Sequence, residues 1–137
     1  CIAVTATDIS RDALSLAQEN ADLNEVQINL VESDLFSAIS AKFDLITCNP
    51  PYLSQADMNA LQKEVSFEPA LALFGGEDGL DYYRRIAQTY QTHLNPSGTL
   101  LLEIGSTQAD EVAALFAAKT SVLKDLGGND RLLVVEP

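Results

Sequence analysis

The sequence predicts an α/β fold with a mostly parallel sheet and an antiparallel hairpin at its C-terminal edge. Short apolar runs alternate with amphipathic stretches, and turn residues mark each change. The last two strand-like runs flank Gly127-Gly128-Asn129-Asp130, which is typical of a hairpin turn. Because the chain has 137 residues, 47% of them hydrophobic and 20% charged, we expect one compact domain over residues 1–137.

The N-terminal part predicts a strand, a helix and a second strand. Val4–Asp8 is the first strand-like run, and Ser10 can cap a helix that extends to about Asn20 through apolar residues at helical spacing. Gln27–Glu32 is the next strand-like run. This order begins the α/β alternation.

The strongest strand signal is Phe43–Cys48, an apolar run interrupted only by Asp44. Such a run predicts a central strand with both faces covered. Pro50 and Pro51 end it, because proline has no amide hydrogen to continue a ladder. Residues 53–79 then form a long connection with a short helix near 56–64 and a turn at Gly75-Gly76, and connections of this length are usually functional.

The C-terminal half continues the alternation. Apolar residues at helical spacing predict an amphipathic helix over 80–94, which Asn95-Pro96-Ser97-Gly98 ends. The remaining predicted elements are a buried strand over 99–104, a helix over 107–119 and two hairpin strands over 121–126 and 131–135.

Composition and charge exclude several classes of function. Twenty acidic against eight basic residues give a formal charge of -12, which repels phosphate backbones and makes nucleic acid a disfavoured partner. Cys1 and Cys48 are too few for a disulfide framework, and neither belongs to a cluster with metal-site spacing. No stretch is long and apolar enough for a membrane span, and the N-terminus lacks a secretory signal. We therefore expect a cytoplasmic protein without a metal.

Polar residues follow three predicted strands at their carboxyl ends, where sheets of this class bind ligands. Asp8 ends the first strand, and its carboxylate can accept both hydroxyls of a ribose. Asp34, Leu35 and Phe36 follow the second, where a carboxylate and apolar side chains can hold an adenine. Asn49-Pro50-Pro51-Tyr52 follows the third and presents a rigid carbonyl pair beside an aromatic ring. The set predicts a crevice for an adenosyl cofactor and a planar NH2 group.

Each of these residues also has a purely structural interpretation. Asp8 can serve only a helix-capping turn, and Asp34 can be a solvated loop acid. Leu35 and Phe36 read alone are core residues. The Pro50-Pro51 pair can simply stop a strand. For Asp8 and Asp34, their places at successive strand ends favour the functional interpretation, and for Pro50-Pro51 the segments that follow favour it.

The same residues carry a family resemblance. The chain resembles the HemK/PrmC family, which are S-adenosylmethionine-dependent methyltransferases with a Rossmann-like class I fold. Its members modify the side-chain amide nitrogen of the glutamine in the Gly-Gly-Gln motif of class I peptide chain release factors. The matching segments are Thr7–Ser10, Ser33–Phe36, Asn49–Tyr52, Phe67–Leu73 and Gly76–Leu80.

The resemblance implies a role for each matching residue. The Asn49 side-chain oxygen and the Pro50 carbonyl would accept the two hydrogens of the substrate amide, and Tyr52 would pack on its flat face. The implied catalytic residues are Asn49, Pro50 and Tyr52; the implied substrate contacts are Asn49, Pro50, Pro51, Tyr52, Phe67 and Glu68; and the implied S-adenosylmethionine contacts are Asp8, Asp34, Leu35, Phe36 and Asn49.

The chain also departs from the family pattern. Family members open with a strand and a Gly-rich loop close to the cofactor, and this chain shows neither. Cys1-Ile2-Ala3 is similar to the start of the helix directly after that loop, so we expect residues to be missing before Cys1 and between Ala3 and Val4. The N-terminal helical domain that helps dock the release factor is absent as well. Activity of this stretch on its own is therefore not implied by the resemblance.

Two other functions stay open. An adenine-N6 nucleic-acid methyltransferase resembles the family at Asn-Pro-Pro-Tyr and would use the same geometry on an exocyclic NH2 group, although the acidic charge counts against it. A noncatalytic remnant that binds a partner through residues 53–79 is the other alternative. The segments Phe-Glu-Pro and Gly-Glu-Asp-Gly-Leu favour the release factor enzymes.

Overall fold

The computed structural model describes residues 2–60 and 69–136, and the chain divides into two compact units, residues 1–41 and 42–137. The single domain over the whole chain stays a prediction. No helix in the described part of the chain is long and apolar enough to cross a membrane.

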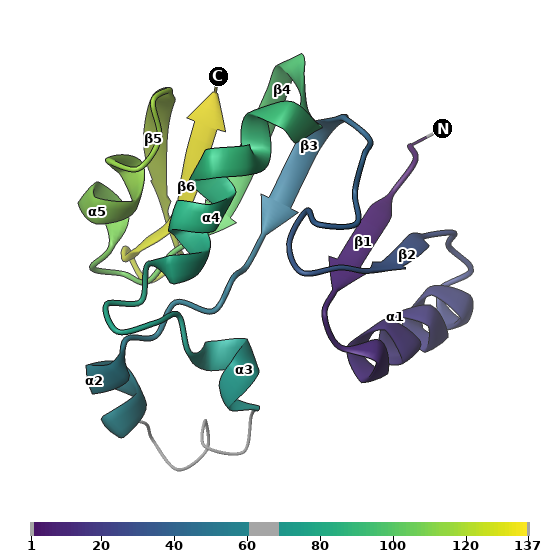
Figure 1. Ribbon diagram of the computed structural model, residues 1–137, viewed down its shortest axis with the longest axis horizontal. Coiled ribbons are helices and arrows are strands. Elements are labelled where there is room, and N and C mark those ends of the chain that lie inside the picture. Colours follow the sequence, from purple (N-terminus) through teal and green to yellow (C-terminus); the bar gives the residue numbers. More distant parts are fainter. Residues whose placement is uncertain (1, 61–68, 137) are drawn as a thin grey trace. The chain divides into compact units, whose positions relative to one another are not determined.

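The first unit is a parallel strand pair joined by a helix, as predicted (Figure 1). Its elements are β1 (Thr5–Asp8), α1 (Arg11–Leu23) and β2 (Asn29–Glu32). Thr5 pairs with Asn29 at the start of the ladder. The Ser10 side chain accepts a hydrogen bond from the amide of Ala13 at 3.3 Å, which confirms the predicted cap. The helix extends past its predicted end near Asn20.

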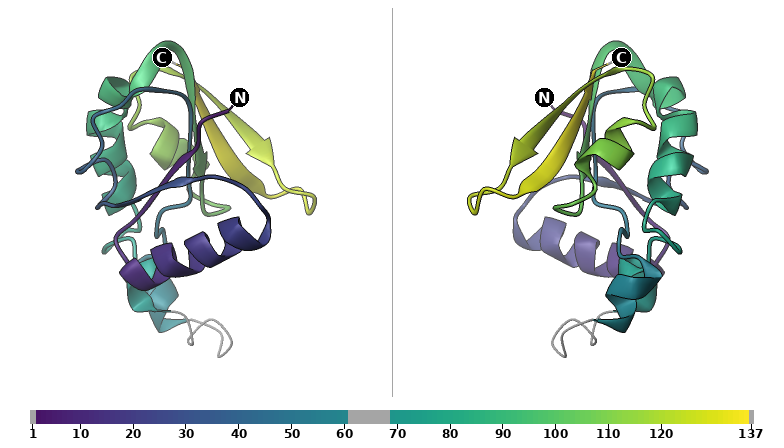
Figure 2. Two further views of the ribbon diagram at one scale, coloured as in Figure 1. Left: turned by 90° about the vertical axis from the view of Figure 1, so that its right-hand side faces the viewer. Right: turned by 90° about the vertical axis from the view of Figure 1, so that its left-hand side faces the viewer.

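The second unit is built on a four-stranded sheet with the strand order β3-β4-β6-β5. β3 runs parallel to β4, β6 is antiparallel to β4, and β5 is antiparallel to β6. The predicted hairpin therefore forms one edge of this sheet, and Figure 2 shows it on the side of β4 away from α4. The strands are β3 (Phe43–Cys48), β4 (Leu94–Glu103), β5 (Lys119–Lys124) and β6 (Asp130–Glu136), and the helices are α2 (Gln55–Asn59), α3 (Ala70–Leu73), α4 (Asp81–Thr89), the 3-10 helix η2 (Tyr90–His93) and α5 (Ala109–Ala113).

β3 has the predicted bounds but a different place. The apolar run predicted a central strand covered on both faces, whereas β3 is the outer strand of the four-stranded sheet and pairs only with β4 among the described residues. Leu45 is also 55% exposed, so the faces of β3 are not both covered. The prediction failed because apolarity reports the surface that a strand can bury and not the partners that pair with it.

Asn95–Gly98 follow the end of the helical residues, as predicted, but the strand expected to begin at 99 begins earlier, at Leu94. These residues lie inside β4, where the register shifts: Phe43 pairs with Leu94, but Leu45 already pairs with Thr99. The extra residues bulge out of the ladder instead of ending it. Proline and glycine interrupt the hydrogen bonds of a ladder, and a bulge accommodates this interruption without ending the strand.

The helix predicted over 107–119 is short, because α5 ends at Ala113 and β5 begins at Lys119. Phe116 is still buried, and its ring meets the ring of Tyr90 edge-on at 5.4 Å and 69°. The apolar spacing that suggested a longer helix thus comes from a residue that packs after the helix has ended.

The core of the second unit lies between α4 and the middle strands. Tyr83 and Ile86 of α4 are fully buried, as are Leu100 and Leu102 of β4 and Leu133 of β6. Figure 1 shows α4 lying over β4. The core therefore fixes β4, whose partner β3 carries the candidate site at its carboxyl end.

Candidate active site

The chain leaves β3 at Cys48 and continues as Asn49-Pro50-Pro51-Tyr52, as predicted. Asn49 is exposed, Pro50 is buried, and Pro51 and Tyr52 are half-buried. Neither proline has an amide hydrogen, so the ladder with β4 stops here. The loop formed by residues 49–52, which we call the strand-end loop, begins at the carboxyl end of a parallel strand, where α/β sheets bind ligands.

The strand-end loop lines a hollow of about 290 Å³. The residues that line it are Asn49, Pro50, Pro51, Tyr52, Leu53, Ala72 and Leu73. The structure therefore brings together the four predicted substrate contacts of the strand-end loop. Their roles stay predictions, and the other two predicted contacts, Phe67 and Glu68, lie outside the described residues.

Helix α3 closes one side of this hollow, which the sequence did not predict. Leu53 and Phe74 form a parallel bridge, and the Leu53 amide donates to the carbonyl of Leu73 at 2.9 Å. The Gly75 amide in turn donates to the Leu53 carbonyl at 2.8 Å. Ala72 and Leu73 thus reach the hollow because backbone hydrogen bonds hold the end of α3 against the chain leaving the strand-end loop.

The Gly76–Leu80 segment lies against the same loop. Gly79 has φ +78°, a left-handed conformation that favours glycine. A Cβ atom at this position would overlap the carbonyl oxygen of Tyr52. Packing therefore explains the second glycine of the Gly-Glu-Asp-Gly-Leu motif, because only glycine at position 79 leaves room for the strand-end loop.

The Tyr52 side chain is held from the end of β4. Its hydroxyl donates to Oε1 of Glu103 over a long 3.4 Å, while the Tyr83 hydroxyl donates to the Glu103 carbonyl at 2.7 Å. Burial, followed by the Glu103 charge, raises the pKa of Tyr52. Tyr52 is therefore a neutral phenol at neutral pH, suited to packing rather than to accepting a proton.

The predicted cofactor contacts Asp8 and Asp34–Phe36 lie in the first unit, at the carboxyl ends of β1 and β2. The Ser33 amide donates to the Asp8 carbonyl at 3.0 Å, so the two strand ends adjoin. One oxygen of the Asp8 carboxylate accepts from the Ser10 amide at 2.8 Å, which is the capping turn left open by the sequence. Leu35 adopts φ +51°, which is uncommon for a residue with a side chain and turns the chain sharply after Asp34.

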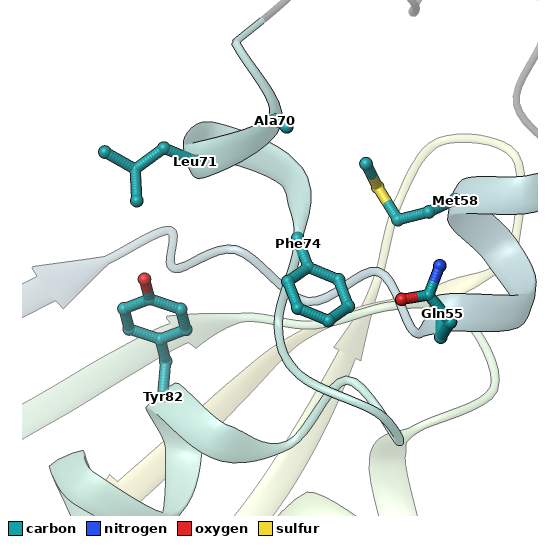
Figure 3. A pocket seen from close by; sticks show the side chains of 6 residues that line it. All are labelled: Gln55, Met58, Ala70, Leu71, Phe74 and Tyr82. Atoms are coloured by element: carbon teal, nitrogen blue, oxygen red, sulfur yellow. The ribbon is translucent and has the colours of Figure 1, made fainter.

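A second hollow, of about 350 Å³, lies beside α3 (Figure 3). Figure 3 shows its wall contributed by α2, α3 and α4, with the Phe74 ring at its centre. The residues that line it are Gln55, Met58, Ala70, Leu71, Phe74 and Tyr82. This hollow is mainly apolar and contains none of the predicted site residues.

Two residues near the strand-end loop had no signal in the sequence. Glu103 is the last residue of an apolar strand, and Gln108 lies in the turn before α5. Gln108 is nevertheless one of the two buried polar residues among those the structure describes, and it is 9% exposed. Only knowledge of the tertiary contacts could have identified either residue.

Comparison with known proteins gives two kinds of likeness. Residues 1–73 match the family described as "Methyltransferase small domain". The chain is 46% identical to the release factor glutamine methyltransferase of Streptococcus pneumoniae, over 97% of this chain and 50% of that protein. It is 47% identical to the protein of the same name from Cereibacter sphaeroides, over 97% of this chain and 54% of that protein. The chain thus spans about half the length of the curated relatives it matches.

Solved structures share the fold at lower identity. A methyltransferase from Pyrococcus furiosus gives a TM-score of 0.71 at 19% identity, covering 98% of this chain and 62% of that one. The Thermus thermophilus 16S rRNA N2 G1207 methyltransferase, solved with AdoMet and guanosine, gives 0.63 at 18% identity over 98% of this chain and 31% of that one. These likenesses confirm the predicted Rossmann-like class I fold.

Proposed function

Because the chain belongs to the methyltransferase small domain family, we propose that its protein transfers a methyl group from S-adenosylmethionine to a glutamine side chain of a release factor. The acceptor is the amide nitrogen of the Gly-Gly-Gln glutamine in a class I peptide chain release factor. The observation that carries this proposal is the likeness to release factor glutamine methyltransferases over nearly the whole chain. The strand-end loop supplies the chemistry that the reaction needs.

The reaction is difficult because an amide nitrogen is a poor nucleophile. Its lone pair is delocalised into the carbonyl group, so a catalyst must orient the NH2 group and favour a pyramidal nitrogen. Two fixed acceptors can do this by binding its two hydrogens. The Asn49 side-chain oxygen and the Pro50 carbonyl oxygen are our candidates, since both residues line the same hollow and the proline ring fixes the backbone there.

The same contacts favour the transition state over the bound substrate. Positive charge develops on the nitrogen as the new N–C bond forms, and acceptor oxygens stabilise that charge. The Tyr52 ring packs on the flat face of the amide in this proposal, with its hydroxyl anchored to Glu103 at 3.4 Å. After transfer the nitrogen carries an extra proton, which is acidic and passes to solvent, so no strong base is needed beforehand.

Neighbouring titratable groups agree with this division of roles. Burial raises the pKa of the Cys48 thiol to about 11, so this residue beside Asn49 stays protonated and is not a nucleophile at neutral pH. The raised pKa of Tyr52 likewise keeps its hydroxyl as a hydrogen-bond donor. The acceptor groups of the site are therefore neutral amide and carbonyl oxygens.

The first unit fits the adenosyl part of the proposed cofactor. Asp8 and Asp34 are carboxylates at adjoining strand ends, suited to ribose hydroxyls and to the adenine amino group respectively. The half-buried side chains of Leu35 and Phe36 offer apolar surface for the adenine ring. S-adenosylmethionine supplies an electrophilic methyl group when bound, and Asp8, Asp34, Leu35 and Phe36 would hold its adenosyl part.

The test is methyl transfer from labelled S-adenosylmethionine by the complete protein, offered a class I release factor and adenine-containing DNA and RNA in parallel. We expect label on the release factor, and about a 100-fold loss in Asn49→Ala because one acceptor of the developing charge is removed. Asn20→Ala, on the exposed face of α1, is the matched control and should match the wild type. Label on nucleic acid alone would indicate an adenine methyltransferase, and label on neither would favour a noncatalytic binding role.

A further inference from the structure

Gln108 is a buried polar side chain that the proposed chemistry does not use. It is 9% exposed and directly precedes α5. Burying an amide costs free energy unless its donors and acceptor form hydrogen bonds, so the hydrogen bonds of Gln108 indicate its role.

The Gln108 side chain joins three segments that are far apart in the sequence. Its Nε2 donates to the carbonyl oxygen of Tyr52 at 3.1 Å and, over a longer 3.5 Å, to that of Gly79. Its Oε1 accepts from the Gly105 amide at 3.0 Å. One side chain therefore ties the strand-end loop to the segment before α4 and to the turn after β4.

The backbone of Gln108 is itself fixed, which makes the side chain a firm anchor. Its amide donates to the Gly105 carbonyl at 3.0 Å, and its carbonyl accepts from the Val112 amide at 2.9 Å. A Cβ atom on Gly105 would lie 2.7 Å from Oε1 of Gln108, and one on Gly79 would lie 2.8 Å from Nε2. The two glycines thus leave the space that the amide group occupies.

The position of this anchor along the strand-end loop matters more than its strength. The loop is held at its start by the pairing of Cys48 with Leu102 in the β3–β4 ladder. Pro50 and Pro51 have no amide hydrogens with which to hold the middle of the loop. The bond from Gln108 to the Tyr52 carbonyl holds its end. The two proposed acceptor oxygens lie between these two fixed points.

We propose that Gln108 is a positioning residue for methyl transfer: by holding the Tyr52 carbonyl it sets where the Asn49 and Pro50 oxygens meet the substrate amide. This inference rests on the proposed function, because it assigns Gln108 a task in that same site. Gln108 touches neither substrate nor cofactor, and it acts through the strand-end loop. Its loss should therefore slow the transfer step much more than it weakens cofactor binding, because Asn49 is the only predicted cofactor contact on this loop.

The test compares Gln108→Met with Gln88→Met in the complete protein. Methionine has a similar length and no amide, and Gln88 is exposed on α4 and serves as the matched control. We expect kcat to fall about 10- to 100-fold in Gln108→Met, since displacements near 1 Å cost this much. The KM for S-adenosylmethionine should stay within about twofold of the wild type. A kcat equal to that of Gln88→Met would overturn the inference.

A double mutant separates positioning from general stability. If Gln108 acts through the strand-end loop, Gln108→Met should slow the Asn49→Ala variant by a smaller factor than it slows the wild type, because one of the two acceptors that it positions is already gone. Losses that multiply in the double mutant would contradict this. If Gln108→Met does not fold, Gln108→Glu replaces it, because glutamate keeps the shape and the acceptor for Gly105 but not the donor. Failure of both variants to fold would assign Gln108 to stability alone and overturn the inference.

Amide hydrogen exchange distinguishes failure of this inference from failure of the proposed function. The Leu53 and Gly75 amides are bonded beside the end of the strand-end loop and should exchange faster in Gln108→Met than in Gln88→Met. A wild-type protein that methylates no release factor would refute the proposed function, and faster exchange would still support the anchoring of the loop by Gln108. Unchanged exchange would overturn that anchoring whatever the activity.

Discussion

Gly75→Ala should disturb the strand-end loop directly. Gly75 is buried, and a Cβ atom added to it would lie 2.7 Å from the Pro51 carbonyl oxygen and 2.8 Å from the Cα atom of Tyr52. A third close neighbour is the Gly79 carbonyl oxygen at 2.9 Å. All three are backbone atoms, which cannot move aside as the end of a side chain does, and the φ of Gly75 lies outside the left-handed range. The close approach is thus the only obstacle to alanine.

The size of the effect can be worked out from these distances. Ordinary contact with a Cβ atom begins at 3.4 Å, so the Pro51 carbonyl lies 0.7 Å too close. Overpacking of this kind costs about 1–3 kcal/mol of stability. Relief by movement of the strand-end loop would displace the proposed acceptors by a similar distance, and we expect about a 10- to 100-fold loss of kcat.

The assays are denaturant unfolding and methyl transfer to a release factor, with Gly127→Ala as the matched control. An added Cβ atom at Gly127 would meet only the side-chain ends of Asp125 and Asn129, both at 3.2 Å. These side chains can yield, so the control should lose little stability or activity. Equal stability and equal kcat in Gly75→Ala and Gly127→Ala would refute the reasoning.

Three further predictions concern stability. Tyr83→Phe should lower the free energy of unfolding by about 1 kcal/mol, because the hydroxyl donates to a β4 carbonyl at 2.7 Å. Denaturant unfolding at the wild-type midpoint would contradict this. Leu100→Ala should cost about 2–5 kcal/mol in the same assay, since the side chain is fully buried, whereas Leu123→Ala on the exposed face of β5 should change stability by less than about 0.5 kcal/mol. The hydrogen bond from Arg84 lowers the pKa of Asp78 from 3.8 to about 2. The contribution of this interaction to stability is therefore present above pH 3.8 and is lost as the pH falls through 2. Stability measured from pH 4 to pH 2 should therefore fall slightly less in Asp78→Asn, the effect being small because both side chains are about half exposed; identical profiles would exclude the contribution.

Features that depend on local pattern could be predicted from the sequence. Ser10 begins a helix, Phe43–Cys48 is a strand, and Gly127 and Gly128 lie in a hairpin turn, as predicted. The Asp125 amide closes this turn by donating to the Asn129 carbonyl at 2.8 Å. Each of these is determined by residues that are neighbours in the chain. The same signals placed Asp8 and Asn49 at strand ends.

Features that depend on tertiary pairing could not be predicted. Apolar residues in Phe43–Cys48 gave no information on how many strands pair with it. Asn95–Gly98, expected to separate a helix from a strand, proved to be a bulge in a longer strand. Gln108 reads as an ordinary residue before a helix until its contacts with Tyr52 and Gly79 are seen. These contacts span 56 and 29 residues of sequence, beyond the reach of any local pattern.

The central claim is that the strand-end loop presents a side-chain amide for methylation, and mass spectrometry of the methylated product tests it most directly. A class I release factor would be incubated with the complete protein and S-adenosylmethionine, digested and mapped. We predict a single added methyl group on the side-chain nitrogen of the Gly-Gly-Gln glutamine, formed about 100-fold more slowly when Asn49→Ala replaces the wild type. A methyl group on any other residue, or one that Asn49→Ala still transfers at the wild-type rate, would contradict the account.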